Sequence, residues 1–406
     1  MERKSKERVQ PVKKYAGNEL RYLKKVLNGE DGPHGSWVTS LEQEFLKIFP
    51  GKYAIAMNSG TGTLHSALEA VGVGYKDEVI TPALTVFMDT SSILHANAIP
   101  VYVDIDLETF NISPSEVEKA ITKKTKAIIA VSLYGLPHNI SELDKISRKY
   151  NIPIIEDHAQ TMLAKYKGKT VSVSKGLSSW SFESTKHLSS GEGGILVTNN
   201  AKYAEIARKV GGQGYKNLTP SGGMIKFGKS ENVQNPQYKR HDTLGWNYRM
   251  NEFTAAVALA QLEQLDEKVI KRVSIANRLL EIIGNSEILT PQKIPKNYTH
   301  SYYTLGCLLN DKFNWQEFRS KFIEYGGEGF YSAWSVPFNE PAYGEITFKN
   351  RFAKDFIKSM KNQKGFKNAE YLQNHLVQFK TNFLVKKDIL LQERALKKTL
   401  HYFSRK

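Results

Sequence analysis

The sequence is poor in cysteine and in long apolar runs. Its 406 residues include one cysteine, Cys307, which excludes an internal disulfide and a metal site built from paired cysteines. No apolar run approaches the ~18 residues that a membrane-spanning helix needs. The first residues, MERKSKERVQPVKKY, lack the apolar core of a secretory signal. We therefore expect a protein of the reducing cytoplasm.

Acidic residues are scarce relative to basic ones. Aspartate and glutamate number 41 against 57 lysines and arginines, which gives a formal net charge of +16. Such a charge can attract nucleic acid, but the basic residues are dispersed, and neither zinc-finger spacing nor an RNP-like aromatic strand accompanies them. A solvated basic surface, or attraction of a small phosphate-bearing molecule, is therefore favoured over a nucleic-acid site.

The order of apolar and polar segments predicts the fold class. From Tyr53 to about Asn200, short apolar runs such as YAIAM, IPVYVDI and IPIIED alternate with helical patterns, which is typical of a mainly parallel α/β sheet. The runs are nearly continuous, as expected of strands covered on both faces. In such sheets ligands bind at the carboxyl ends of the strands.

The length and the later segments predict two domains. Residues 212–243 are rich in Gly, Asn, Pro and Lys without periodicity, which indicates a functional or disordered loop. A long helical pattern covers 251–283. We expect it to join an N-terminal arm and large domain over 1–283 to a smaller C-terminal domain over 284–406.

Polar residues follow two of the predicted strands. Residues 58–63 (NSGTGT) come after YAIAM and open a helix; they would let backbone N–H groups approach a phosphate, although ordinary helix capping explains them equally well. Asp157 comes directly after IPIIE. The adjacent His158 could suggest a metal, but neighbouring residues rarely converge on one ion and no third ligand is spaced nearby, so we expect no metal.

Lys186 lies between the end of a predicted strand and a glycine-rich turn. It follows Ser181, the end of another apolar run, and precedes the turn GEGG. A lysine at a sheet edge can attack an aldehyde if its pKa is lowered, although this position alone is also compatible with a surface lysine. A phosphate cup, an acid, a hydroxyl and a lysine together match pyridoxal phosphate, which carries a phosphate, a pyridine nitrogen, a phenolic oxygen and an aldehyde.

The chain resembles the DegT/DnrJ/EryC1/StrS family of pyridoxal-phosphate-dependent sugar aminotransferases of fold type I. The resemblance rests on NSGTGTLHSALEAVGVGYKDEVITP, HANAIPVYVDID, IEDHAQ, SFESTKHLSSGEGGILVTNN and GWNYRMNEFTAA, which follow the family's order from about residue 17 to 280. It implies a large domain with a mainly parallel central sheet in an αβα sandwich, followed by a smaller α+β domain.

The resemblance also implies roles for individual residues. Lys186 matches the lysine that binds the cofactor aldehyde, and Asp157 matches the acid paired with the pyridine nitrogen. The other matches are Gln160 near the phenolic oxygen, Gly60, Thr61 and Ser181 at the phosphate, Val86 or Phe87 over the ring, and Asn247 of the partner subunit, which reaches the phosphate across a homodimer with shared active sites.

The implied reaction moves an amino group from an amino acid, by family habit L-glutamate, to a nucleotide-linked keto-sugar. Pyridoxamine phosphate carries the amino group between the two half-reactions, and amino-sugar or surface-glycan (lipopolysaccharide, O-antigen) biosynthesis would use the product. Two alternatives remain. One is a cofactor-dependent sugar dehydratase on the same scaffold; the dehydratases of this family have a histidine at the position that matches Lys186. The other is a non-catalytic regulator.

Some segments depart from the family pattern. PFNEPAY lacks the histidine usual in the small domain, and Val86 stands where an aromatic is usual. The 212–243 segment is longer than is typical, and we expect three of its lysines, Lys226, Lys229 and Lys239, to attract a diphosphate. These departures concern substrate contacts more than cofactor chemistry.

Overall fold

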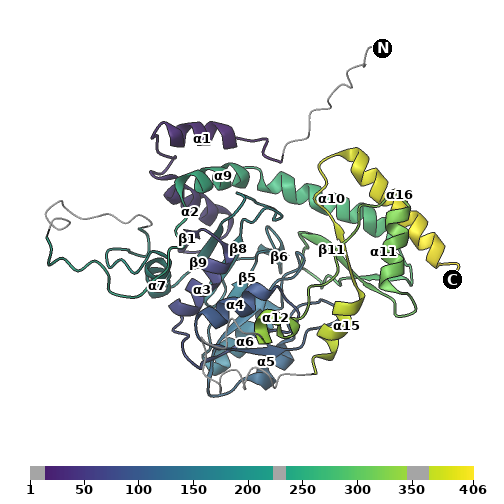
Figure 1. Ribbon diagram of the computed structural model, residues 1–406, viewed down its shortest axis with the longest axis horizontal. Helices are drawn as coiled ribbons and strands as arrows, with labels where there is room; N and C mark the ends of the chain where they lie inside the picture. Colours follow the sequence, from purple (N-terminus) through teal and green to yellow (C-terminus); the bar gives the residue numbers. More distant parts are fainter. Residues whose placement is uncertain (1–13, 223–234, 345–364) are drawn as a thin grey trace, which may run out of the picture.

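The computed structural model describes residues 14–222, 235–344 and 365–406, so Lys226 and Lys229 lie outside the described residues. A seven-stranded sheet with the order β1-β9-β8-β5-β4-β2-β3 forms the centre of the larger part (Figure 1). Its strands are β1 (Tyr53–Met57), β2 (Glu78–Pro82), β3 (Ile99–Val103), β4 (Thr125–Val131), β5 (Ile154–Asp157), β8 (Leu177–Ser181) and β9 (Gly194–Thr198).

Strand direction explains where the connection between β8 and β9 lies. The pairs from β8 to β3 are parallel, whereas β9 runs antiparallel to both of its neighbours, β8 and β1. The predicted mainly parallel α/β sheet is confirmed. Because β8 and β9 are adjacent and antiparallel, residues 182–193 turn back at the carboxyl edge of the sheet without a crossover helix. This connection holds Lys186.

The central strands are covered on both faces. Along β4, Ala127, Ile129 and Val131 belong to one apolar core, whereas Ile128 and Ala130 belong to another, as the two-residue period of a strand requires. Helices α3 (Gly60–Ala70), α4 (Phe87–His95) and α7 (Ala201–Gly211) pack on the first face. Helices α2 (Trp37–Ile48), α5 (Pro114–Ala120), α6 (Ile140–Tyr150) and α9 (Glu252–Leu262) pack on the second.

A separate core forms around a smaller antiparallel sheet of β10 (Leu289–Pro291), β11 (Thr304–Leu309) and β12 (Leu376–Lys380). Helices α11 (Trp315–Glu324), α16 (Lys386–Phe403) and α10 (Leu265–Ile283) contribute to it. At its start α10 packs into the core of the large sheet through Val269, and further along into the smaller core through Ile275. A domain boundary near Gly284 is compatible with this arrangement and stays a prediction.

The helix expected over 251–283 is two helices. α9 ends at Leu262 and α10 begins at Leu265. At the break, the Glu263 carboxylate accepts hydrogen bonds from Asn18 Nδ2 (2.6 Å) and from the hydroxyl of Tyr22 in α1 (Glu19–Leu27). The apolar period continues through the break, so the sequence pattern did not reveal it.

The other described elements are short. They are α12 (Pro341–Gly344), α15 (Lys367–His375), the 3-10 turn η1 (Pro337–Asn339), and the hairpin of β6 (Lys165–Tyr166) and β7 (Lys169–Thr170). In the predicted loop, Tyr215 pairs with His241, and Lys216 Nζ lies 4.1 Å from the Tyr238 ring centre. Within the described ranges, no helix combines the length and the apolar character needed to cross a membrane.

Candidate active site

The structure places several of the predicted residues at the carboxyl edge of the large sheet. Asp157 is the last residue of β5 and Ser181 is the last residue of β8, and these strands are parallel neighbours. Gly60 opens α3 after β1, so close to Ser181 that a Cβ on Gly60 would lie 2.9 Å from the Ser181 Cβ. The strand order therefore brings together residues that are about 120 positions apart in the chain.

The start of α3 forms a backbone cradle. The Ser59 hydroxyl caps the helix by accepting a hydrogen bond from the Gly62 N–H (3.0 Å). The N–H groups of Gly60 and Thr61 have no hydrogen-bond partner among the described residues. Free N–H groups at a helix N-terminus, with the Ser181 hydroxyl beside them, are the donor set that a phosphate takes. The cradle fits the phosphate of the implied cofactor.

Substitution of Gly60 tests the cradle. Gly60→Ala would place a methyl group against Ser181 and push α3 away, so we expect the affinity for pyridoxal phosphate to fall about 10-fold, or ~1.4 kcal/mol. Fluorescence titration of the apoprotein measures it. Gly74→Ala is the matched control, because a Cβ there would meet nothing within 4 Å. Equal affinities of the two variants would show that the cradle does not hold the phosphate.

Asp157 is buried beside a second carboxyl group. Its Oδ1 accepts the Ala159 N–H (2.8 Å), and burial raises its pKa against the opposing effects of this N–H and of the Lys186 charge. Asp89, in the first turn of α4, is fully buried and lies close enough to Asp157 for each carboxyl group to shift the pKa of the other. One Asp89 oxygen also accepts the Thr85 hydroxyl. Burial first, and then the Asp157 charge, raise the pKa of Asp89 well above its usual range.

Two buried carboxyl groups that lie this close rarely both ionise, so we expect them to hold one proton between them. Oδ1 of Asp89 is buried and no N–H or O–H group of the described chain donates to it, which agrees with a proton between the two carboxyls. The Asp157 charge raises the pKa of Asp89, whereas Asp89 and the Lys186 charge lower the pKa of Asp157, so we expect Asp89 to hold this proton and Asp157 to keep the negative charge. Asp89 lies inside a helical pattern, away from any strand end, so no sequence pattern indicated it.

The shared proton predicts a pH-dependent effect of Asp89→Asn. A carboxyl group with a raised pKa stabilises the fold only while it is protonated, so its contribution is lost as the pH rises from the ordinary value of an aspartate through the raised pKa. Asparagine keeps the hydrogen bonds without this dependence. We expect the thermal unfolding midpoint of Asp89→Asn to exceed that of the wild type by a few degrees at pH 8, since 1 kcal/mol of stability corresponds to about 2–4 °C. The difference should be smaller at pH 5.

Thermal unfolding of the apoprotein at both pH values measures this effect. The control is Asp31→Asn, which removes one carboxylate from an exposed position and should leave the midpoint unchanged at both pH values. A gain for Asp89→Asn that is the same at pH 5 and pH 8 would contradict the shared proton.

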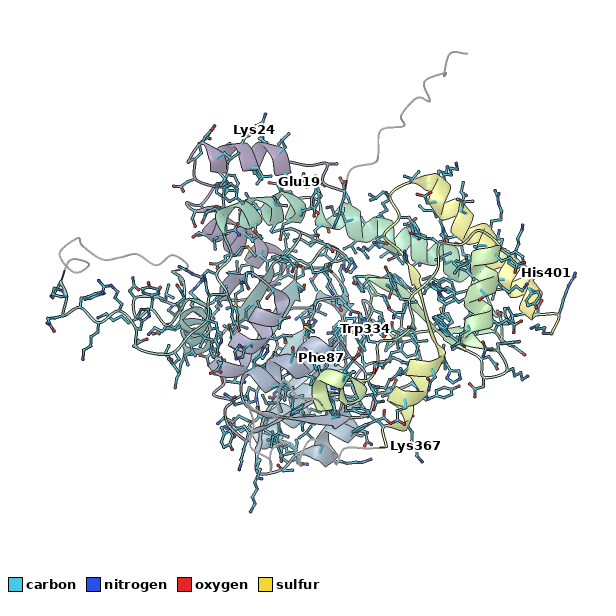
Figure 2. All side chains as sticks on the ribbon, viewed as in Figure 1. Glu19, Lys24, Phe87, Trp334, Lys367 and His401 are labelled. Carbon is cyan, nitrogen blue, oxygen red and sulfur yellow. The ribbon has the colours of Figure 1, made fainter. Side chains whose placement is uncertain are left out.

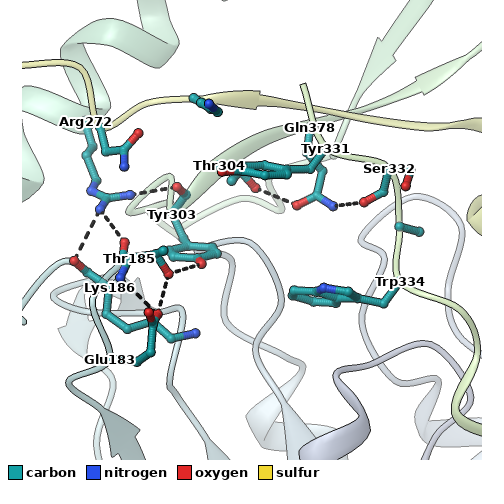
Figure 3. A pocket seen from close by; sticks show the side chains of 13 residues that line it. Glu183, Thr185, Lys186, Arg272, Tyr303, Thr304, Tyr331, Ser332, Trp334 and Gln378 are labelled. Carbon is teal, nitrogen blue, oxygen red and sulfur yellow. Dashed lines mark hydrogen bonds between the residues drawn. The ribbon is translucent and has the colours of Figure 1, made fainter. Parts of the chain in front are cut away.

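The loop that carries Lys186 accepts hydrogen bonds from a residue that lies outside the large sheet. The buried guanidinium of Arg272, from α10, donates hydrogen bonds to the carbonyls of Tyr303 and Thr185 (both 2.8 Å) and of Lys186 (3.3 Å). The Lys186 amine lies 4.8 Å from the centre of the Tyr303 ring (Figure 3). Arg272 therefore fixes the backbone that carries Lys186. It is one of several cations along α10, and the sequence did not distinguish it.

His187, next to Lys186, is unavailable as a base. It is buried, and its Nε2 donates to the Ser301 carbonyl (2.9 Å). Burial, followed by the charge of Arg272, lowers the pKa of His187 well below its usual range. His158 is also a core residue, stacked on His138 with the rings 5.8 Å apart. Burial lowers the pKa of His158 to about 4.

The remaining predicted residues lie in three different places in the structure. Gln160 is buried and its Oε1 accepts the Tyr134 N–H (2.7 Å), which leaves its NH₂ group as the donor. Val86 and Phe87 are half-buried at the start of α4, where Figure 2 shows Phe87 near the middle of the molecule. Asn247 lines another cavity, of about 640 Å³, that Lys186 does not line. The described chain does not bring Asn247 to its own Lys186.

A cavity of about 410 Å³ opens beside Lys186. Rings of Tyr303, Tyr331 and Trp334 line it together with polar groups of Gln378 and Thr304 (Figure 3). The Thr304 hydroxyl donates to Gln378 Oε1 (3.1 Å), and Gln378 Nε2 donates to the Ser332 carbonyl (2.7 Å). The cavity thus combines stacking surfaces with fixed polar groups at the reactive amine, a composition typical of small-molecule sites.

Comparison with known proteins gives concordant matches. The sequence model described as the DegT/DnrJ/EryC1/StrS aminotransferase family matches residues 13–372. A relative described as GDP-perosamine synthase, from Escherichia coli O157:H7, is 33% identical over 305 residues, 75% of this chain and 78% of the relative. A pleiotropic regulatory protein of Geobacillus stearothermophilus is 36% identical over 298 residues, 72% and 75% respectively. The solved structure of the aminotransferase from Psychrobacter cryohalolentis has a TM-score of 0.82 at 25% identity, covering 97% of this chain and 98% of that one.

Proposed function

The chain belongs to the DegT/DnrJ/EryC1/StrS aminotransferase family, and from this premise we propose that it transfers the amino group of L-glutamate to a nucleotide-linked keto-sugar. The family, the fold class and the dependence on pyridoxal phosphate predicted from the sequence are confirmed. The observation that carries the proposal is that Lys186, Asp157 and the free N–H groups at the start of α3 lie at one edge of the large sheet. Similarity to a GDP-perosamine synthase supports a nucleotide-linked sugar as the acceptor.

Each polar residue at the sheet edge is proposed to hold one part of the cofactor. The Gly60 and Thr61 N–H groups and the Ser181 hydroxyl bind the phosphate. The Asp157 carboxylate holds a proton on the ring nitrogen, and the Gln160 NH₂ group donates to the phenolic oxygen. Val86 or Phe87 covers the ring. When bound, pyridoxal phosphate supplies an aldehyde that takes up the amino group and a ring that accepts the electron pair left at the donor carbon.

Lys186 has two tasks in this proposal. Its amine binds the aldehyde in the resting enzyme and is released when the donor amine takes its place. The free amine would then move the proton from the donor Cα to the former aldehyde carbon, and in the second half-reaction it would move a proton from that carbon to the sugar carbon that receives nitrogen. Proton transfer by a positioned group contributes about 10²–10⁴ in rate. Arg272 supports both tasks by fixing the Lys186 backbone.

We further propose a cytoplasmic homodimer in which Asn247 of the partner subunit completes the phosphate site, because Asn247 lines a different cavity from Lys186 in its own chain. Mixing subunits tests this. Lys186→Ala and Asn247→Asp should each be nearly inactive, and re-associated mixtures should regain about a quarter of wild-type activity, since half of the dimers then carry one intact site. Mixtures without any regained activity would exclude shared sites.

The reaction is tested directly with purified protein, L-glutamate and a series of nucleotide-linked keto-sugars. Formation of 2-oxoglutarate in step with an amino-sugar, identified by mass spectrometry, is the expected result. Omission of the sugar should stop turnover after a single amino-group transfer per site. Deoxygenated sugar without stoichiometric 2-oxoglutarate would instead indicate a dehydratase, and an amino-sugar pathway would be excluded if no tested sugar were aminated.

A further inference from the structure

A second, smaller cavity lies against the connection that carries Lys186. Its volume is about 270 Å³, and it shares Thr185, Lys186 and Arg272 with the aromatic cavity of Figure 3. Its other walls come from α10 and from residues 381–384, before α16. Lys14, Lys268 and Lys271 add further positive charge, and the described residues that line this cavity include no aspartate or glutamate.

The cations of this cavity are bound by neutral oxygens. Lys271 Nζ donates to the Leu384 carbonyl (2.9 Å), and Lys268 Nζ donates to Gln261 Oε1. Lys14 Nζ donates to the Ser184 carbonyl and to Ser189 Oγ (3.2 Å). The three hydrogen bonds of the Arg272 guanidinium likewise go to backbone carbonyls. These contacts orient the cations without neutralising them.

Carboxylates outside the lining of this cavity act on two of its cations, Glu183 on Lys186 and Glu19 on Lys268. Glu19, on the side of α1 that faces α9 (Figure 2), acts on Lys268 only through its charge, and its Oε1 accepts a hydrogen bond from Gln261 Nε2. Burial lowers the pKa of Lys268 to about 8, and the charges of Lys14 and Arg272 lower it too, while Glu19 opposes them. Among these cations Arg272 is buried and Lys268 is half-buried, whereas Lys14 and Lys271 are exposed. An anion in the cavity would offset the repulsion between the two less exposed cations.

We propose that this cavity binds a phosphate or diphosphate group. Separate ammonium groups around a cavity suit the spread charge of phosphate oxygens, since lysine binds phosphate as a point charge. The planar fork of Arg272, which a carboxylate would use, is already occupied by carbonyls. The cavity is smaller than the ~300–1,000 Å³ typical of sites for whole ligands, so it accommodates an anionic group and not a complete nucleotide.

Two sources can supply this group. One is the diphosphate of the nucleotide-linked sugar, with the rest of that molecule in the adjoining aromatic cavity; this source rests on the proposed function. The other is a free phosphate or diphosphate. Both place the anion next to the backbone of Lys186, where its charge would act on the amine of the same residue.

The experiment measures binding of inorganic pyrophosphate to the holoenzyme by calorimetry, with the cofactor's own phosphate site filled and without amino acid or sugar. The Lys268→Gln/Lys271→Gln variant should bind pyrophosphate at least about 10-fold more weakly than the wild type, since it loses two charge-assisted hydrogen bonds to the anion. Lys123→Gln/Lys124→Gln removes the same charge from exposed positions and should bind like the wild type. Lys268→Arg/Lys271→Arg, which keeps the charge, should retain most of the affinity.

Competition between a nucleoside diphosphate and pyrophosphate identifies the source of the bound anion. A nucleoside diphosphate that displaces pyrophosphate assigns the site to the nucleotide-linked substrate, whereas pyrophosphate that stays bound assigns it to a free anion. Wild-type protein that binds no pyrophosphate, or equal weakening in both glutamine variants, would overturn the proposal. Because no amino group is transferred in this experiment, these outcomes are independent of whether the proposed reaction occurs.

Discussion

Lys186→Ala is expected to lower the rate of amino-group transfer by about 10⁴-fold or more, because one amine both binds the aldehyde and moves the proton. No neighbouring group can replace it. His187 is locked on the Ser301 carbonyl, and Lys380, the other lysine of the aromatic cavity, is paired with Glu328 (3.1 Å). The Arg272 guanidinium donates to three backbone carbonyls and stays protonated, so it cannot accept the proton.

Single-turnover measurement of 2-oxoglutarate formation from glutamate gives this rate. Lys169→Ala, at an exposed position of β7, is the control and should react like the wild type. A small primary amine added to Lys186→Ala should restore part of the rate, since it can take up the donor proton in place of the lost side chain. A rate within ~10-fold of the wild type would remove Lys186 from the chemistry.

Asp157→Asn is expected to give the second-largest effect. The neutral amide cannot hold a positive charge on the ring nitrogen, and removing one partner of a buried ion pair costs about 3–5 kcal/mol, which corresponds to roughly 10²–10⁴-fold in rate. The loss should appear in the chemical step, because the phosphate contacts and Lys186 remain in place.

Asp89→Asn is the matched control for Asp157→Asn. It removes a carboxyl group from the same buried pair, but from the member that we expect to hold the proton, so its effect on the rate should be much smaller. Single-turnover rates of the two variants at pH 7.5, compared with their cofactor affinities, decide the matter. Equal rate losses would contradict the assignment of the negative charge to Asp157.

The sequence predicted those parts of the site that depend on local pattern. The apolar runs located the strands, and the residues directly after them, Asp157 and Ser181, lie at the carboxyl edge as the parallel topology requires. The sequence also indicated Gly60 at the start of α3, because a helix that begins with small residues after a strand can approach a phosphate. The family resemblance extended this set to Gln160 and Asn247, whose roles stay proposals.

Other parts of the site depend on packing between distant segments. Asp89 meets Asp157 across 68 positions of sequence, and its place within α4 gave no signal. Arg272 reaches the Lys186 connection only because α10 crosses between the two cores. The break at Glu263 depends on hydrogen bonds from α1, at the other end of the chain. No periodicity encodes such contacts.

The central claim is that the amine of Lys186 binds the cofactor. Reduction of the holoenzyme with sodium borohydride, followed by peptide mass spectrometry, tests it most directly, because reduction makes permanent whichever bond joins the cofactor aldehyde to a lysine. We expect the phosphopyridoxyl group on the peptide that contains Lys186, with much less of it after prior treatment with glutamate. The group on a different lysine, with Lys186 unmodified, would contradict the account.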